Sequence, residues 1–554
     1  MATETAPPIA VGGLEGLANF IDDLMGGIAL ISFALSLGAL IWNRLVLKSL
    51  LPPGSGSERL FRHSLRWLYL GAFALGASHG VALLAKAWVL KETLGVLPWA
   101  AYTATVQFKA GLIRMLLALA LGLVGRGLVR SLENATRWHL VWSLMAAIVI
   151  CGAWLTHGVG RFEMRELLMA TTVLHQLCGA LWFGGVVQLI VFWRVARTDP
   201  VLQPCWPRAV RRFSTLGALA VAGLLFTGIP LAWHFIDNFT ALIGTGYGSL
   251  LLTKIALMLG ALGLAWFNYQ AGKRWERQGQ NPSLYRTIPH LIEAESFLLV
   301  SALFVAATLS SQPPAVDIPH LTASPGEVWH MFSPKWPQLT SPTHEELLIG
   351  EIQRATIVDK EAPVFATQWS NFNHNVSGLI LTIMALIGLA GYWLRWRWPK
   401  YWPAGFIVLG VFLFFRSDAQ AWPLGPLGFW ESTFGDGEIF QHRLATLLTF
   451  ILGGLEIRAR TNLAAHRLRY LFPILCAVGG ILLLTHAHGG FELKTEYLIQ
   501  STHTVMGLLA IFMAASRWLE LKLEPPASVW AGMVSMGSMT LIGLLLMFYD
   551  EPLY

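Results

Sequence analysis

The stretch VLHQLCGALWFGG, residues 173–185, decides the fold, because it is almost wholly apolar and yet carries a histidine and a cysteine. His175 and Cys178 are three residues apart, which is nearly one helical turn, so both side chains share a face if the stretch is helical. With its apolar flanks the stretch is long enough to cross a membrane. It therefore predicts a membrane helix that carries a pair of metal-binding side chains.

The rest of the chain has the composition of a membrane protein. It is 554 residues long, 55% hydrophobic and 13% charged, with a mean hydropathy of +0.55, whereas soluble domains contain about 25% charged residues. Apolar windows of about 18 or more residues recur from end to end, as a hydrocarbon core about 30 Å thick requires. We therefore predict an all-α polytopic membrane protein.

About fourteen membrane-spanning helices are expected, and basic residues orient them. The predicted spans are centred near residues 35, 77, 115, 147, 180, 224, 260, 301, 385, 409, 448, 477, 508 and 538. Most of the 39 Lys and Arg residues fall in alternate loops, and cytoplasmic loops carry an excess of such residues. This pattern predicts that both termini are extracytoplasmic. The net charge of +7 lies in these loops and does not indicate nucleic-acid binding.

A long polar stretch divides the spans into two groups. Residues 312–374 are rich in Pro, Glu and Trp and are predicted to be an extracytoplasmic loop, either partly folded or a linker. Before it lie an extracytoplasmic N-terminal segment, residues 1–24, and an eight-span domain, residues 25–311. After it comes a six-span domain, residues 375–554.

The two groups share a motif, which predicts two related helical bundles. LTHGVGRFEMRELLMATTVLHQLCGAL covers residues 155–181, and LTHAHGGFELKTEYLIQSTHTVMGLL covers residues 484–509. Both begin with Leu-Thr-His, continue through Phe-Glu and end in His-x-x-(Cys or Met)-Gly. The alignment pairs His157 with His486, His175 with His503, and Cys178 with Met506. Duplicated bundles are common among membrane transporters.

Most histidines fall in the extracytoplasmic half of the predicted spans, where they suggest metal-binding stations. In the first group Cys151, His175 and Cys178 are expected at one depth, with His157 above them. Imidazole, thiolate and thioether groups suit Cu(I). The complete set of candidate metal ligands is His157, His175, Cys178, Cys151, His486, His488, His503 and Met506.

Two other interpretations of the same residues remain open at this stage. Intramembrane histidines can simply hydrogen-bond neighbouring helices, which would make the pair structural. Facing histidines can also hold a b-type haem, and Lys or Arg residues inside the spans could bind its propionates. For haem the candidate ligands are His79, His175, His442 and His503, and the candidate cations are Lys109, Arg114, Lys254 and Arg443.

Residues from about 140 to 315 resemble the CopD family of inner-membrane copper-resistance proteins. The resemblance lies in LHQLCGALWFGGVVQL (174–189), FSTLGALAVAGLLFTGIPLAW (213–233), YGSLLLTKIALMLGALGLAWFN (247–268) and the helix that starts at Glu295 and ends in LSSQPP (309–314). The positions that match the recurrent family pattern are His175, Trp182, Gly184, Gly185 and Lys254. Cys178 matches no such pattern, and the six-span domain departs from the short family form.

The resemblance implies copper movement across the bacterial cytoplasmic membrane, with a periplasmic copper chaperone as partner. We therefore expect a copper transport or resistance protein and not an enzyme, with a membrane haem protein as the alternative. No G-x-x-x-x-G-K-[ST] motif is present, so no nucleotide site of that kind is expected.

Overall fold

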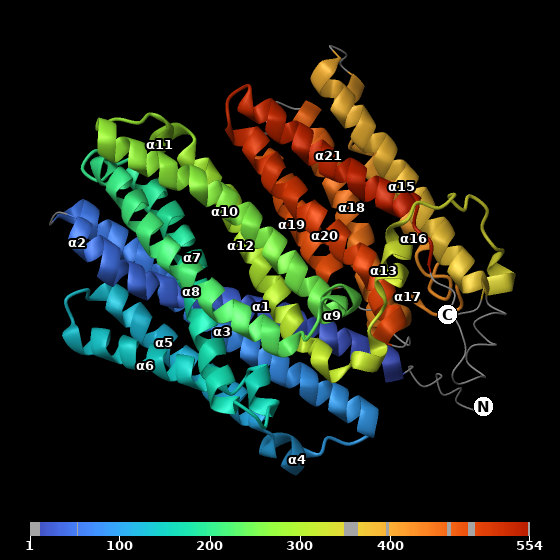
Figure 1. Cartoon of the computed structure of the whole chain (residues 1–554), viewed down its shortest axis with the longest axis horizontal. Coiled ribbons are helices and arrows are strands. Elements are labelled where there is room, and N and C mark those ends of the chain that lie inside the picture. The colour runs from blue at the N-terminus through green and yellow to red at the C-terminus, as the bar shows by residue number, and fades with distance from the viewer. Residues whose placement is uncertain are drawn as a thin grey trace. The chain divides into compact units, whose positions relative to one another are not determined.

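The computed structural model describes residues 11–51, 54–347, 364–394, 398–461, 467–485 and 493–551, and within these ranges helices and short turns form the fold, with no β-strand (Figure 1). Twelve of the described helices are long and apolar enough to cross a membrane. The prediction of an all-α polytopic membrane protein is confirmed.

Each of the fourteen predicted spans falls on a helix. The two outside the group of twelve are α18 (Gly437–Thr461), which carries charged residues near both ends, and α19 (Leu471–Leu484), which is apolar but short. One buried carboxyl group of α18 is paired with two arginines. Glu456 is fully buried, and its Oε1 atom lies 2.7 Å from both Arg460 Nε and Arg517 Nη2. A buried carboxylate is tolerated when it is paired in this way.

The chain forms two compact units. The eight-helix unit comprises residues 21–237 and 254–314, and the six-helix unit comprises residues 1–20, 238–253 and 315–554. Long helices of the eight-helix unit are α1 (Val11–Trp42), α3 (Ser55–Leu94), α5 (Val106–Arg130), α6 (Ala135–Ala153), α7 (Arg165–Ala196), α8 (Trp206–Phe235), α10 (Gly246–Gln278) and α12 (Ile288–Ser311). The first residues of α1 and α10 belong to the other unit.

Helix α7 is the centre of the eight-helix unit. It contacts α3, α6, α8 and α12, and it crosses α1 where Gly184 meets Gly38. A Cβ atom added to Gly38 would lie 2.5 Å from the Gly184 Cα atom. Only glycine at both positions allows so close an approach, as small residues do at other membrane helix crossings. This crossing fixes the position of α7 and of the side chains it carries.

The six-helix unit is a closed ring of neighbouring helices. Its members are α15 (Val364–Trp393), α16 (Ala404–Arg416), α18, α19, α20 (Leu493–Lys522) and α21 (Ala527–Met547). Each contacts the next in the chain, and α21 returns to contact α15. Gly378 and Gly543 lie at the α15–α21 contact, where an added Cβ atom would meet backbone of the other helix. The backbones of α15 and α21 therefore lie in close contact at these two glycines.

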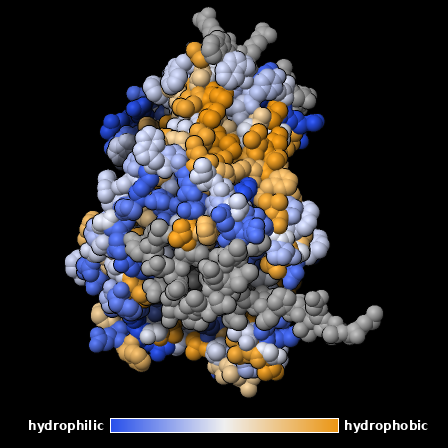
Figure 2. All heavy atoms as spheres, turned by 90° about the vertical axis from the view of Figure 1, so that its right-hand side faces the viewer, coloured by the Kyte–Doolittle hydropathy of each residue, from blue (hydrophilic) through white to orange (hydrophobic). Residues whose placement is uncertain are grey.

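The six-helix unit has an apolar outer surface, as a lipid-facing bundle requires. Leu386 on α15 and Val408 on α16 are more than half exposed, and Ile383 and Val411 are nearly so. Figure 2 shows apolar residues gathered in a broad area on this side of the molecule, bordered by hydrophilic ones. The distribution matches a helix bundle that has lipid as its solvent.

Part of the predicted extracytoplasmic segment is folded. Helix α13 (Pro325–Phe332) begins with a capping box between Ser324 and Glu327, and Glu327 forms a 2.7 Å ion pair with Lys494 at the start of α20. Ala323 N donates to the Gly244 carbonyl at 2.9 Å. Through residue 347 the segment is thus packed structure rather than a bare linker.

Candidate functional site

His175 is the centre of a polar contact among three helices of the eight-helix unit. Its Nδ1 atom, on α7, lies 2.9 Å from the Thr227 hydroxyl on α8. Its Nε2 atom lies 3.3 Å from the Lys254 Nζ atom on α10. Polar side chains that join three membrane helices in this way are costly to bury unless each is satisfied by another.

The donors and acceptors assign the proton of His175. The Lys254 ammonium can only donate, so the Nε2 atom of His175 accepts. The Thr227 hydroxyl donates to the Gly223 carbonyl at 2.7 Å, so its oxygen accepts from the Nδ1–H group of His175. The imidazole is therefore neutral, and its Nε2 lone pair faces Lys254.

Cys178 belongs to the same helix as His175, α7, and lies about one turn further along it. A Cβ atom added to Gly223 of α8 would lie 2.5 Å from the Cys178 Sγ atom, and one added to Gly228 would lie 3.0 Å from Cε1 of His175. The two glycines leave room for the two side chains. His175 and Cys178 thus form a neighbouring nitrogen and sulfur pair against α8.

Cys151 and His157 lie elsewhere in the eight-helix unit. The Cys151 thiol, on α6, donates to the Ala110 carbonyl of α5 at 3.2 Å. His157 opens a short 3₁₀ helix after α6, with its ring centroid 6.0 Å from that of Phe235. Across the described ranges, no three His, Cys, Asp or Glu side chains are close enough to hold a metal ion together. The structure therefore does not bring Cys151 into one group with His175 and Cys178.

A second polar contact, which sequence reasoning missed, joins α7 and α10 to α12. Glu295 of α12 is 1% exposed and accepts two hydrogen bonds. One comes from the Trp182 indole at 2.9 Å and the other from the Asn268 amide at 3.0 Å. Trp182 is seven residues beyond His175 on α7, so one helix supplies both contacts. A carboxyl group in the first half of the predominantly apolar α12 was the available signal.

In the six-helix unit, His503 and Met506 are both buried on α20. His503 Nδ1 lies 3.1 Å from the Ile499 carbonyl oxygen, and its ring centroid lies 5.6 Å from that of His374 on α15. His374 was not among the predicted ligands. The predicted ligands His486 and His488 lie outside the described residues.

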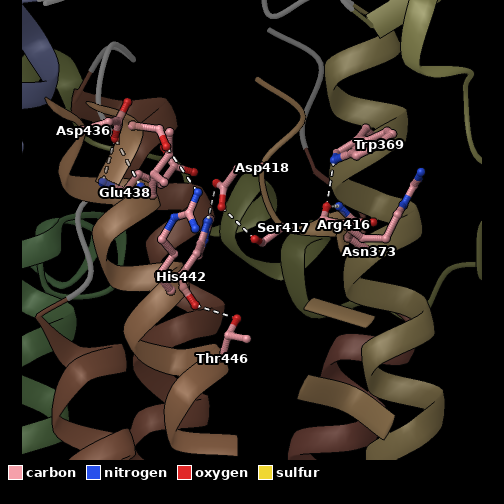
Figure 3. Close-up of polar contacts among 12 residues, drawn as sticks. Trp369, Asn373, Arg416, Ser417, Asp418, Asp436, Glu438, His442 and Thr446 are labelled. Carbon is pink, nitrogen blue, oxygen red and sulfur yellow. Dashed lines mark hydrogen bonds and ion pairs between the residues drawn. The ribbon is translucent and has the colours of Figure 1, made fainter. Parts of the chain in front are cut away.

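His442 forms an ion pair at one end of the six-helix unit (Figure 3). Its Nδ1 atom lies 2.8 Å from Asp418 Oδ1, and Ser417 donates to the other carboxylate oxygen at 2.7 Å. Asp436 accepts from the backbone N–H of Glu438 at 2.8 Å. Burial, followed by the adjacent Glu438 carboxylate, raises the pKa of Asp436. Asp436 also accepts from the backbone N–H of Ile439 at 3.3 Å, so it caps the start of α18.

The cations predicted inside spans have partners that are mostly uncharged. Arg443 donates to the Trp422 carbonyl at 3.0 Å, and buried Arg114 stacks 5.5 Å from the Phe33 ring centroid. Lys109 is exposed.

In the described ranges His79 Nε2 is buried and has no hydrogen-bond partner. Of the four candidate haem ligands, His175 and His442 each direct a ring nitrogen at a charged side chain.

Comparisons with known proteins agree on copper. Residues 207–309 match the family CopD, described as copper resistance protein D. The copper transport protein CutJ of Bacillus subtilis (strain 168) is 28% identical over 140 residues, which are 25% of this chain and 24% of that protein. The chain thus matches about a quarter of the length of this curated relative. No solved structure matches the chain.

The family match covers most of the residues in the two polar contacts of the eight-helix unit. It includes Thr227 on α8, Lys254 and Asn268 on α10, and Glu295 on α12. His175 and Trp182 lie before the matched residues, on α7. The chain is therefore a multi-pass membrane protein with a CopD (copper resistance protein D) segment at residues 207–309.

Proposed function

We propose that this protein transports copper across the bacterial cytoplasmic membrane and acts in copper uptake or resistance, not as an enzyme. The observation that carries the proposal is the His175–Cys178 pair, packed on α8 beside Lys254. Its partner helices α8 and α10 fall within the CopD segment. The matching family and the matching relative are both named for copper.

The chemistry of the pair suits a transient copper site. A neutral imidazole nitrogen and a cysteine sulfur are donors that Cu(I) favours. The Nε2 lone pair of His175 already faces the Lys254 ammonium at 3.3 Å, so copper has to displace that cation in order to bind. Competition between copper and the Lys254 ammonium keeps the affinity for copper low. Ions move between sites only when each site releases them readily.

Further stations in the proposal are His157 and Cys151 in the eight-helix unit, and His503 and Met506 in the six-helix unit. His486 and His488 complete the proposed set. Copper would reach these residues from the extracytoplasmic side, delivered by a periplasmic copper chaperone. In the described part of the chain, no three His, Cys, Asp or Glu side chains surround one point. Soft donors spread over several helices in this way fit a path of several weak copper-binding sites.

Copper content of bacteria that express the protein tests this function. We expect expression of the wild type to change cellular copper relative to an empty vector, and we expect His175→Ala and Cys178→Ser to abolish that change. His139→Ala is the matched control, because His139 is exposed and far along the chain from the pair. Equal copper content in wild-type and His175→Ala cells, at equal membrane protein levels, would reject the proposal.

A further inference from the structure

Two histidines meet inside the six-helix unit, outside the CopD segment. His374 on α15 and His503 on α20 have ring centroids 5.6 Å apart, with the ring planes at 79°. Two imidazoles from different helices therefore share one level of the bundle.

The hydrogen bonds of the two rings set the same tautomer in both. His374 Nδ1 lies 2.9 Å from the Ser370 carbonyl oxygen, and His503 Nδ1 lies 3.1 Å from the Ile499 carbonyl oxygen. A carbonyl oxygen only accepts, so Nδ1 carries the proton in each ring and Nε2 carries the lone pair. Metal-binding histidines are usually oriented by a hydrogen bond of this kind on the other ring nitrogen.

The distance between the rings fits a shared metal ion. Metal–imidazole bonds are about 2.0 Å long. Two Nε2 atoms that bind one ion at trigonal or tetrahedral angles therefore hold their ring centroids roughly 5 to 6 Å apart. The observed separation of 5.6 Å lies within that range. The ring planes are nearly perpendicular, which is an edge-to-face arrangement.

The surroundings of the two rings are held in place and contain an unsatisfied polar group. Tyr549, which is 3% exposed, has its ring centroid 4.5 Å from that of His374. Its buried hydroxyl has no hydrogen-bond partner among the described residues. Asn375 donates to the Tyr549 carbonyl at 2.8 Å, and Asn371 donates to Asp550 at 2.7 Å. These bonds fasten the segment after α21 against α15, beside the histidines.

We propose that His374 and His503 bind one copper ion between α15 and α20. The identity of the metal rests on the proposed copper function, while the site rests on the geometry of the two rings. Imidazole nitrogen is a good copper ligand, and Met506 is buried one turn further along α20. The site gives the six-helix unit a binding role of its own.

Copper titration of the purified full chain tests the site apart from the His175–Cys178 pair. The protein carries His175→Ala and Cys178→Ala, the probe is Cu²⁺ alone, and the readouts are copper per chain and electron paramagnetic resonance. We expect bound copper with nitrogen coupling, and we expect His374→Asn or His503→Asn to remove one copper per chain. His320→Asn, a matched change at an exposed histidine, should remove none.

Three results would overturn the proposal. Copper that stays bound in both His374→Asn and His503→Asn rejects this site and leaves the proposed function standing. A wild-type protein that binds no copper at all rejects both. A variant could also lose copper because it misfolds. Pulsed electron paramagnetic resonance on ¹⁵N-histidine-labelled protein that keeps His374 and His503 avoids this problem. Coupling to two imidazoles supports the site, and coupling to none rejects it.

Discussion

The Nζ atom of Lys254 lies 3.3 Å from the Nε2 atom of His175. Lysine and copper would therefore bind the same imidazole nitrogen, and a cation has to leave before a second one enters. A fixed positive charge at this distance repels an incoming copper ion, and the repulsion is strong because little water is present to screen it. We infer that Lys254 limits how tightly the His175–Cys178 pair holds copper.

Replacing Lys254 is expected to tighten copper binding. In Lys254→Met the competing ammonium is lost while much of the side-chain volume remains. We expect the affinity for Cu(I) to rise about tenfold, which corresponds to about 1.4 kcal/mol. Competition against a chromophoric Cu(I) chelator measures the change in the purified protein.

The matched control for that change is Lys109→Met, because Lys109 is exposed and should leave the affinity unaltered. A lower copper affinity in Lys254→Met would contradict the competition argument. It would mean that the ammonium holds the imidazole in its binding orientation.

Removal of the Glu295 carboxylate should destabilise the eight-helix unit. Glu295→Ala leaves the Trp182 indole and the Asn268 amide without their acceptor, and each buried unsatisfied donor costs about 1 to 3 kcal/mol. We expect a clear fall in the thermal unfolding temperature of the detergent-solubilised protein. Asn268→Ala removes one of the two bonds and should cause a smaller fall. Equal unfolding temperatures in wild type and Glu295→Ala would refute this account of the contact.

Adding a methyl group at the α1–α7 crossing should also destabilise the unit. In Gly184→Ala the new Cβ atom would lie 2.7 Å from the Gly38 Cα atom, so the helices have to separate. Overpacking of this kind costs about 1 to 3 kcal/mol. Gly263→Ala is the matched control, because no atom lies within 4 Å of a Cβ atom at that position. Guanidinium or thermal unfolding compares the two variants, and similar stability in both would contradict the close crossing.

Acid should release α13 from α20. The ion pair with Lys494, and the capping bonds with Ser324, hold the pKa of Glu327 below its ordinary value. A carboxyl group with a lowered pKa in the folded state stabilises that state above its unfolded pKa of about 4.3. This stabilisation is lost as the pH falls through the folded pKa.

The part of the tryptophan fluorescence that is lost in Trp329→Phe reports on α13 and follows its release as the pH falls. The change in signal below about pH 4 should disappear in Glu327→Gln, because that variant has no carboxyl group to titrate. Glu345→Gln, at an exposed position of the same segment, should behave like the wild type. An unchanged acid transition in Glu327→Gln would show that another group controls the docking.

Hydropathy was sufficient to predict the helices but not which side chains pair between them. All fourteen predicted spans fall on helices, because a membrane span needs only length and apolarity and both are visible in sequence. Helix α18 was predicted from its apolar middle, and the buried Glu456 lies near its C-terminal end. Glu456 pairs with Arg460, one turn away, and with Arg517, 61 residues away, and only the second pairing leaves no local pattern in the sequence.

The candidate site was only partly visible for the same reason. His175 and Cys178 were found because they are one turn apart on a single helix. Thr227 and Lys254, which contact His175, lie 52 and 79 residues away. Cys151 was expected beside the pair because helical depth was known and rotation was not, whereas its thiol faces Ala110. His374, the proposed partner of His503, was not singled out from the sequence, although it lies in the run Asn-Phe-Asn-His-Asn, an unusual set of polar residues for a membrane helix.

The most direct test of the account is metal analysis and an absorption spectrum on the same purified sample, wild type beside the His175→Ala/Cys178→Ala double variant. The account predicts more bound copper in the wild type than in the variant, equal folding of both by thermal unfolding, and no Soret band in either. A Soret band that disappears with His175 would contradict it and identify a haem protein. Equal copper in the two samples would equally contradict a copper site at this pair.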